Sequence, residues 1–254
     1  MLKSISSPVS RLLAFDCATS VRSVAVWQEG KILSHLQEQA STGEAQRLIP
    51  LIEAAMADAG MNYRDLEGVA VTLGPGSFTG IRVGLATARG LCLAAEKPLL
   101  GITTLEALAG DCPDPMILAT VDSRRREPFV QVFYRDPMSS SDLSTEPYPL
   151  TEPHPLTEPM ACEPELLASV VRASAEGPLT VIGDRATDIV ELLRADKIDA
   201  SLGAPAVPDA ASVARIAASR FAAAQKIPSL AAAAPLYLRP ADAVPARAGG
   251  KLRP

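Results

Sequence analysis

Asp16, Thr19 and Ser20 carry the residue types from which proteins build phosphate-binding turns. They follow a short apolar stretch, residues 11–15, at the point where the chain turns back into a second apolar stretch. The Asp16 carboxylate could hold a magnesium ion through water, and the two hydroxyls with nearby N–H groups could contact phosphate oxygens. Polar turns of this kind also form simply to satisfy their own backbone, and the spacing alone favours that structural interpretation.

A second candidate for chemistry is the turn at Gly74, Pro75 and Gly76. It joins an apolar strand to a helix predicted over residues 79–95, which Ser77 or Thr79 can cap. Free N–H groups at the start of a helix attract anions, so Gly74 and Gly76 join the first turn as candidate nucleotide-binding residues. The same glycines could serve only the geometry of the turn, and local sequence leaves both interpretations open.

The helix over 79–95 is apolar or small on almost every side. Gly80 and Gly84 form a row of small residues that allows another backbone to approach closely, and a further glycine follows at Gly90. Each glycine inside a helix costs ~0.5–1 kcal/mol relative to alanine. Three of them predict a packing role, with a second protein chain as one candidate partner. The proposed contact residues on this helix are Gly80, Val83, Gly84, Thr87 and Gly90.

Composition excludes several classes of protein. The net charge is 24 minus 29, or −5, which argues weakly against a free-standing nucleic-acid binder. No run of 18 apolar residues is present, so no membrane span is expected, and the first residues lack a signal-peptide core. The two histidines and four dispersed cysteines have no metal-ligand spacing, so we expect a cytoplasmic protein with reduced thiols and no metal.

The order of elements predicts an α/β chain with an internal duplication. The first half reads as three strands followed by alternating helices and strands. Its first helix, 45–59, carries Leu48, Ile52 and Met56 on one face. A second apolar strand that ends in an acid, 116–122, begins a repeat of the pattern. We therefore expect lobes at 1–109 and 110–239, with a disordered tail at 240–254.

Three segments of the chain resemble one protein family. They are the opening strand and turn (13–20), the glycine turn with the start of its helix (74–82), and a terminal Pro-Leu-Tyr-Leu-Arg (235–239), with a weaker match at 122–125. The chain is identified by these motifs as similar to the TsaB (YeaZ) family, the glycoprotease-like proteins of bacterial tRNA threonylcarbamoyladenosine synthesis. The likeness spans nearly the whole chain, and the 74–82 motif is the most specific part of it.

The resemblance implies a two-lobed fold of the actin-like ATPase (ASKHA) type. It also implies partnership with TsaD, the paralogue that transfers threonylcarbamoyl to adenosine 37 of tRNAs reading ANN codons, and with the small ATPase TsaE. In this family the two helices of the N-terminal lobe form the TsaB–TsaD contact. Here these are 45–59 and 79–95, which adds Leu48, Ile52 and Met56 to the proposed interface. ATP or ADP with magnesium could bind at that interface or in the cleft.

The family comparison also bears on catalysis. TsaD-like proteins carry two metal-binding histidines four residues apart, and the matching positions here are Thr104 and Leu108. Leucine cannot ligate a metal, so metal-dependent transfer by this chain alone is not expected. Two further departures are Glu44, where many members have histidine, and Cys17, where threonine is usual. The second weakens the phosphate-turn hypothesis.

Three hypotheses follow from the sequence. The leading one is a non-catalytic subunit of the transferase complex that meets tRNA only indirectly and forms a homodimer through 79–95 when alone. The second is a self-sufficient nucleotide-dependent ATPase or kinase, which needs Asp122 as a second carboxylate. The third, an endopeptidase, is disfavoured because Ser77 has no histidine base with a plausible approach.

Overall fold

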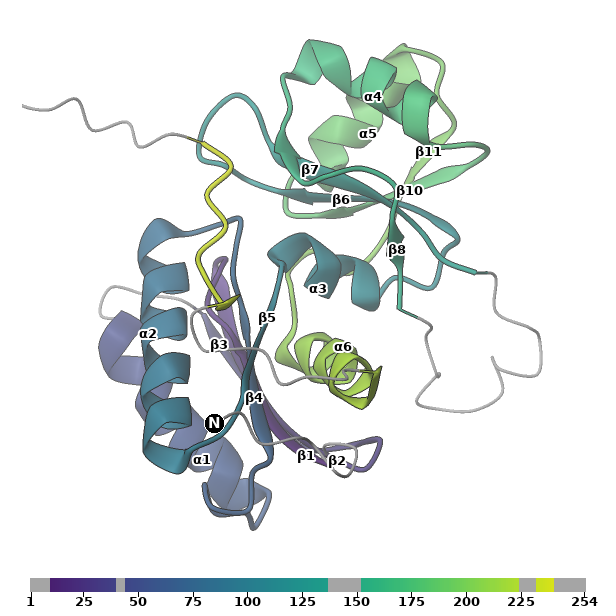
Figure 1. Ribbon diagram of the computed structural model, residues 1–254. Coiled ribbons are helices and arrows are strands. Elements are labelled where there is room, and N and C mark those ends of the chain that lie inside the picture. Colours follow the sequence, from purple (N-terminus) through teal and green to yellow (C-terminus); the bar gives the residue numbers. More distant parts are fainter. Residues whose placement is uncertain (1–9, 40–43, 137–151, 224–231, 240–254) are drawn as a thin grey trace, which may run out of the picture.

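The structure is a computed structural model that describes residues 10–39, 44–136, 152–223 and 232–239. It contains two β-sheets, each with its own helices, stacked one above the other in Figure 1. The tail expected at 240–254 lies outside the described residues. None of the helices in the described part of the chain is long and apolar enough to cross a membrane.

The first sheet has five strands in the order β3-β2-β1-β4-β5. Its first three strands form an antiparallel meander, and β4 and β5 continue the sheet in parallel from β1. The meander forms because a polar turn follows β1 and Glu29 and Gly30, both at positive φ, reverse the chain after β2. The strands are β1 (Arg11–Asp16), β2 (Val21–Gln28), β3 (Lys31–Gln39), β4 (Gly68–Thr72) and β5 (Leu99–Ile102).

The second sheet repeats this topology. β6 pairs antiparallel with β7, which pairs antiparallel with two short strands, while β10 and β11 continue in parallel from β6. The strands are β6 (Met116–Val121), β7 (Phe129–Tyr134), β8 (His154–Pro155), β9 (Met160–Ala161), β10 (Leu179–Gly183) and β11 (Ala200–Leu202). The predicted duplicated, two-lobed α/β fold is therefore confirmed.

The helices divide between the faces of the sheets. α1 (Glu44–Asp58) and α2 (Phe78–Ala95) lie side by side on one face of the first sheet (Figure 1). On the second sheet, α4 (Leu167–Ser174), α5 (Ala186–Ala195) and a short 3-10 turn, η2 (Pro164–Leu166), cover one face. Two more helices, α3 (Thr104–Gly110) and α6 (Ala210–Ala223), lie between the sheets.

Each of the two sequence ranges expected to form a lobe, 1–109 and 110–239, contributes one helix to the sheet of the other range. α3 packs mainly on the second sheet, where Leu105 and Leu108 join the apolar core around β6. α6 returns to the first sheet, where Val213 and Phe221 pack against β1. Each sheet thus has its inner face covered by a helix from the other half of the sequence. Sequence order could not predict this exchange, because either helix has an apolar face that fits either sheet.

The segment 232–239, which we call the C-terminal strap, ties the two lobes together. Ala233 is buried in the first lobe, and the Leu236 N–H donates a hydrogen bond of 2.8 Å to the Leu73 carbonyl. At the other end, the Arg239 guanidinium pairs with the Glu127 carboxylate of the second lobe at 2.6 Å and lies 5.6 Å from the centre of the Phe129 ring. In Figure 1 the strap is the yellow segment that runs from α2 to the upper lobe.

Candidate functional site

A cleft of about 510 Å³ lies between the two lobes, at the ends of β1, β4, β6 and β10. The carboxyl ends of parallel strands are where α/β proteins bind ligands. Its lining comes from two turns of the first lobe and two of the second: Ala18, Thr19, Ser20, Gly76, Ser77, Phe78, Thr79, Val121, Asp122, Ser123, Arg124, Arg125 and Asp184.

On the first-lobe side, the glycine turn packs directly under the first polar turn. The Ser77 N–H donates to the Ala18 carbonyl at 2.7 Å, and a Cβ added to Gly76 would lie 2.1 Å from that same oxygen. Gly76 also has φ +154°, a conformation that L side chains rarely adopt. The geometry of the turn therefore accounts for Gly76 without any ligand. Of the two candidate caps, it is Ser77 whose Oγ accepts from the Gly80 N–H, at 3.2 Å.

Asp16 lies beneath the cleft and does not line it. The side chain is fully buried, and its Oδ1 accepts hydrogen bonds from the Thr72 hydroxyl at 2.6 Å and the Ala18 N–H at 3.1 Å. Among the described residues, its Oδ2 has no hydrogen-bond partner. Burial raises the pKa of Asp16 to about 7, and the two hydrogen bonds offset only part of that effect. A carboxyl held in this way is largely protonated in mildly acidic solution.

This buried acid predicts a pH-dependent stability with a definite sign. Between the ordinary pKa of 3.8 and about 7, the unfolded chain loses the Asp16 proton while the folded chain keeps it, so the free energy of unfolding falls as pH rises. At 1.36 kcal/mol for each pKa unit, the loss reaches roughly 4 kcal/mol. Asp16→Asn removes the titration, so its stability relative to the unsubstituted chain should rise across this window. Urea denaturation at several pH values measures it, and parallel curves for the two proteins would contradict the assignment.

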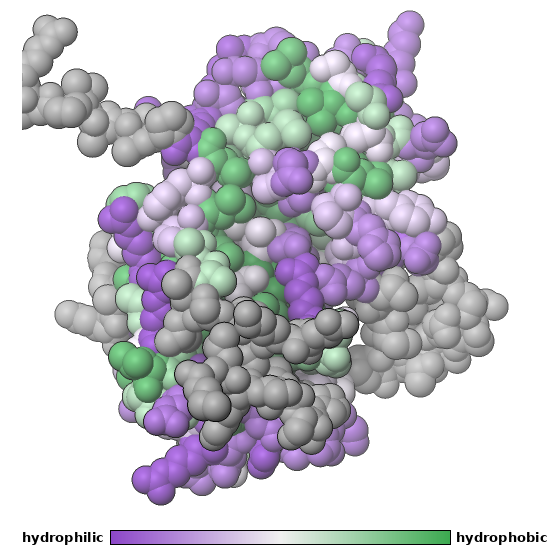
Figure 2. Space-filling model, in the orientation of Figure 1, coloured by the Kyte–Doolittle hydropathy of each residue, from purple (hydrophilic) through white to green (hydrophobic). Residues whose placement is uncertain are grey.

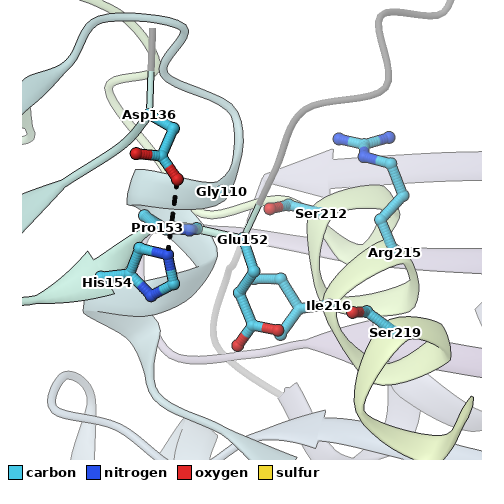
Figure 3. A pocket seen from close by; sticks show the side chains of 9 residues that line it. All are labelled: Gly110, Asp136, Glu152, Pro153, His154, Ser212, Arg215, Ile216 and Ser219. Carbon is cyan, nitrogen blue, oxygen red and sulfur yellow. Dashed lines mark ion pairs between the residues drawn. The ribbon is translucent and has the colours of Figure 1, made fainter. Parts of the chain in front are cut away.

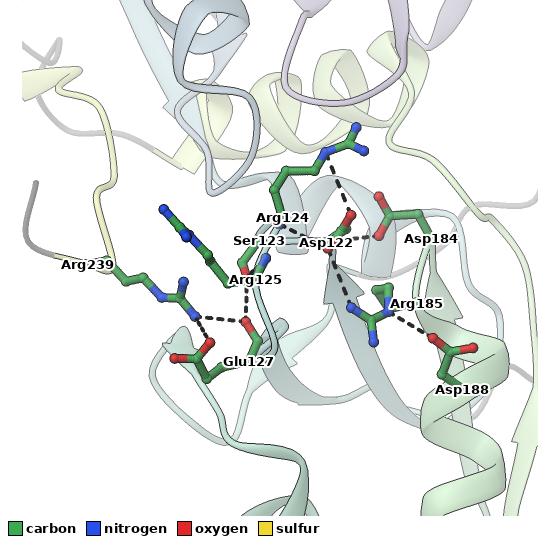
Figure 4. A network of polar contacts seen from close by, with 9 residues as sticks. All are labelled: Asp122, Ser123, Arg124, Arg125, Glu127, Asp184, Arg185, Asp188 and Arg239. Atoms are coloured by element: carbon green, nitrogen blue, oxygen red, sulfur yellow. Dashed lines mark hydrogen bonds and ion pairs between the residues drawn. The ribbon is translucent and has the colours of Figure 1, made fainter. Parts of the chain in front are cut away.

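On the second-lobe side, Asp122 is the centre of a polar network (Figure 4). Its Oδ1 accepts from the Arg124 N–H at 3.0 Å and lies 3.5 Å from an Arg185 nitrogen, and its own N–H donates to Asp184 at 2.7 Å. The carboxylate that the enzyme hypothesis required is therefore already engaged by arginine and by its own turn. Arg185 also bonds Asp188 at 3.0 Å, which holds the network against α5.

The structure brings together three of the five candidate nucleotide-binding residues. Thr19, Ser20 and Gly76 line the cleft, whereas Asp16 lies below it and Gly74 packs against Ile81 and the strap. Three further lining residues, Asp184, Arg124 and Arg125, were not among the predicted site residues. Asp184 directly follows a buried strand, as Asp122 does, and Asp16 is the last residue of one; this position is the signal that could have found Asp184.

The positions that would carry metal ligands are enclosed in the protein. Thr104 and Leu108 are both fully buried, Leu108 in the core between α3 and the second sheet. In the part of the chain that the structure describes, no three metal-ligating side chains gather at one place. The histidines lie elsewhere: His35 pairs with Asp209 at 2.9 Å, and His154 lies 4.0 Å from Asp136. Neither lines the cleft that contains Ser77.

Five residues assigned to the partner interface pack inside the first lobe instead. Leu48, Ile52 and Met56 belong to its hydrophobic core, because the apolar face of α1 is the face that covers the sheet. Gly80 and Gly84 also point inward: a Cβ on Gly80 would lie 1.9 Å from the Cys17 carbonyl, and one on Gly84 would contact Val71. The small-residue row therefore lets α2 approach its own sheet. These five are corrected from interface to core.

The other three assigned residues lie on accessible parts of α2. Val83 and Thr87 are half-buried, and Gly90 is exposed with open space around its Cα. They border an outward surface, which we call the α1–α2 surface, whose members are apolar or small: Ile49, Ala54, Ala57, Ala86, Gly90, Leu93 and Ala94. The Leu93 side chain is 73% exposed, and Figure 2 shows apolar surface over the lower end of α2.

A second hollow, of about 390 Å³, lies between α6 and the second lobe (Figure 3). Two of its charged side chains are paired with residues outside the hollow: Arg215 with Asp111, and Glu152 with Arg220 at 2.6 Å. Asp136 and Glu152 border a part of the chain outside the described residues. The interlobe cleft and the α1–α2 surface remain the two features with a candidate role.

Comparison with known proteins adds three findings. The family model described as "TsaD: tRNA N6-adenosine threonylcarbamoyltransferase" matches residues 36–142. The Escherichia coli protein named tRNA threonylcarbamoyladenosine biosynthesis protein TsaB is 35% identical over 130 residues, which is 50% of this chain and 56% of that protein. A tRNA N6-adenosine threonylcarbamoyltransferase of Erythrobacter litoralis is 47% identical over 72 residues, 28% of this chain and 21% of that protein.

Among solved structures, YeaZ from Pseudomonas aeruginosa is similar with a TM-score of 0.73 and 25% sequence identity. The match covers 90% of this chain and 100% of that one. The sequence matches are shorter, since this chain spans about half the length of the curated relatives it matches first, 56% in each case. Sequence likeness is thus found over part of the chain, whereas likeness of fold extends over nearly all of it.

Proposed function

Because this chain resembles TsaB (YeaZ) in sequence and in fold, we propose that it is a non-catalytic subunit of a tRNA-modifying complex. The complex would contain homologues of TsaD and TsaE. Its product would be N6-threonylcarbamoyladenosine at position 37 of tRNAs that read ANN codons. We place this work in the cytoplasm, where tRNA is modified.

The observation that carries the proposal is the α1–α2 surface. Ile49 and Leu93 are its two large exposed apolar side chains, and its other members are alanine and glycine. Small residues allow a partner helix to approach closely, and exposed large apolar side chains gain free energy when a partner covers them. A TsaD-type paralogue with the same paired helices would fit this surface, and in its absence a second copy of this chain would form an isologous dimer.

The absence of suitable ligands at Thr104 and Leu108 supports a non-catalytic role. Both side chains are buried, so neither could reach a metal at the surface of the cleft. Asp122, which an enzyme would need as a base, is engaged by Arg185 and by the Arg124 N–H. The chemistry would therefore belong to the TsaD-type partner, and this chain would hold that partner in its active arrangement.

Reconstitution tests the proposal. We expect the TsaD and TsaE homologues of the same organism to form threonylcarbamoyladenosine on tRNA only when this chain is added, as measured by mass spectrometry of digested nucleosides. Heat-denatured chain serves as the control. Equal product with and without this chain would contradict the proposal, and product from this chain alone would contradict the non-catalytic role.

A second candidate function is a self-sufficient nucleotide-dependent ATPase or kinase. The observation that favours it is the cleft itself, in which Thr19, Ser20 and Gly76 face Arg124 and Arg125. Isothermal titration of the isolated chain with ATP and magnesium separates the two functions. Binding followed by hydrolysis would support the enzyme, whereas binding that needs the TsaD-type partner would place the nucleotide at a shared interface.

A further inference from the structure

Phe78, Arg82 and Tyr237 form an exposed stack at the mouth of the cleft. The Arg82 guanidinium carbon lies 3.7 Å from the centre of the Phe78 ring, and its Nε donates a hydrogen bond of 2.8 Å to the Tyr237 hydroxyl. The two ring centres are 5.7 Å apart with the planes inclined by 31°. Phe78 is 55% exposed and Tyr237 is 47% exposed. Two large aromatic residues are thus held in fixed positions while much of their surface remains in water.

The backbone holds both aromatic residues rigidly. Phe78 is the first residue of α2 and follows the Ser77 cap. Tyr237 follows Leu236, whose N–H bonds the Leu73 carbonyl, and precedes Leu238, which packs against the second lobe. Little conformational entropy is therefore left to lose when a ligand stacks on these rings. Neither ring fills a core: their mutual contact holds the strap against α2 and uses only part of each ring, so the rest is open to a ligand.

The surroundings of the stack are polar and carry arginines. Phe78 lines the cleft together with the hydroxyls of Ser77 and Thr79, and with Arg124 and Arg125 of the opposite lobe. Two acids, Asp122 and Asp184, also line it, and Arg185 lies against the first of them. With Arg82 at the mouth counted, three arginines face these two carboxylates, because Arg185 is itself balanced by Asp188 at 3.0 Å. An apolar protein segment would have to bury these charges, whereas a base attached to a phosphate backbone would complement them.

We propose that this stack binds an unpaired base of single-stranded RNA, with its backbone directed toward Arg124 and Arg125. Stacking of bases on aromatic side chains next to arginines is the usual way in which proteins hold unpaired nucleotides. The choice of RNA as the nucleic acid rests on the proposed function. The inference goes beyond that function because it assigns direct RNA contact to this chain.

Binding of a labelled RNA hairpin with an unpaired loop, followed by fluorescence anisotropy, tests the inference on the full chain alone. We expect the hairpin to bind more tightly than a fully paired duplex of the same stem. Phe78→Ala should weaken hairpin binding by about 5- to 150-fold, the range found for loss of one stacked base. Phe78→Trp should restore it. Arg82, Arg124 and Arg125 could reach up to three phosphates, which predicts a slope of log K against log salt of about −2.

Leu192→Ala is the matched control, because it shortens a partly exposed apolar side chain on a helix, α5, at a position that does not line the cleft. It should leave RNA binding unchanged. Equal binding of hairpin and duplex, or no effect of Phe78→Ala, would overturn the inference. Full competition by ATP would overturn it in favour of a free nucleotide. The assay contains no TsaD-type partner, so its failure leaves the proposed subunit role intact.

Discussion

Leu93→Arg is expected to weaken binding of this chain to its TsaD-type partner by about 100-fold, the effect of losing one hot-spot contact in an interface. Leu93 is the most exposed large apolar side chain of the α1–α2 surface, and the small residues Ala86 and Gly90 precede it on the same side of α2. An arginine there would place a charge where the partner helix must pack. Calorimetric titration of the partner into each variant measures the change.

Leu192→Arg provides the control for this experiment. Leu192 is also a partly exposed leucine on a helix, but it lies on α5 of the second lobe, away from α1 and α2. It should leave partner affinity unchanged, and both variants should keep the thermal stability of the unsubstituted chain. Sedimentation of each variant alone tests the homodimer on the same surface. If Leu93→Arg bound the partner normally, the α1–α2 surface would not be the interface.

Gly80→Ala and Gly90→Ala should change stability in opposite directions although both lie in α2. The Cβ of an alanine at 80 would lie 1.9 Å from the Cys17 carbonyl, so α2 would have to move away from the first turn. Overpacking of this kind typically lowers the free energy of unfolding by about 1–3 kcal/mol. We expect a value near the upper end of this range, because the added Cβ would meet a backbone carbonyl, which cannot turn aside as a side chain can. At Gly90 nothing lies within 4 Å of the added Cβ, so alanine should stabilise the helix by about 0.5–1 kcal/mol.

Urea denaturation of the two variants at one pH measures both effects. The pair is matched in residue type, helix and size of change, so helix propensity alone predicts the same sign for both. A stabilising Gly80→Ala would show that α2 does not approach the Cys17 carbonyl. Both variants are measured at a protein concentration low enough to dissociate a homodimer through this surface, and a destabilising Gly90→Ala would then contradict the open space around Gly90.

Local sequence was sufficient for the elements and for the duplicated order of the fold. Strand and helix periodicity located the meander and the long helix, whose predicted start at 79 lies one residue from the observed start at Phe78. The acid after each of two buried strands, Asp16 and Asp122, already indicated a repeated architecture. Period, turn residues and capping residues act over a few positions, so they can be read without knowing how the chain packs.

Tertiary packing decided which side of each helix is buried. The glycines of α2 and the apolar stripe of α1 could serve a partner or the protein's own sheet, and periodicity cannot distinguish these because both bury the same kind of surface. The sheet covers Gly80, Gly84 and the Leu48 face, and leaves Gly90 and Leu93 outside. Periodicity also cannot predict the exchange of α3 and α6 between the lobes, because it shows that each helix has an apolar face but not which sheet that face covers.

Some features of the candidate site could likewise be predicted from sequence, and others only from the tertiary structure. The sequence by itself determined the two turns, the family resemblance and the missing ligands at Thr104 and Leu108. Only the tertiary structure placed Asp16 beneath the cleft, Asp184 beside Asp122, and Tyr237 against Phe78. Tyr237 and Phe78 are far apart in the chain, and their contact depends on the strap crossing from one lobe to the other. Long-range contacts of this kind follow from the complete fold and have no signature in local sequence.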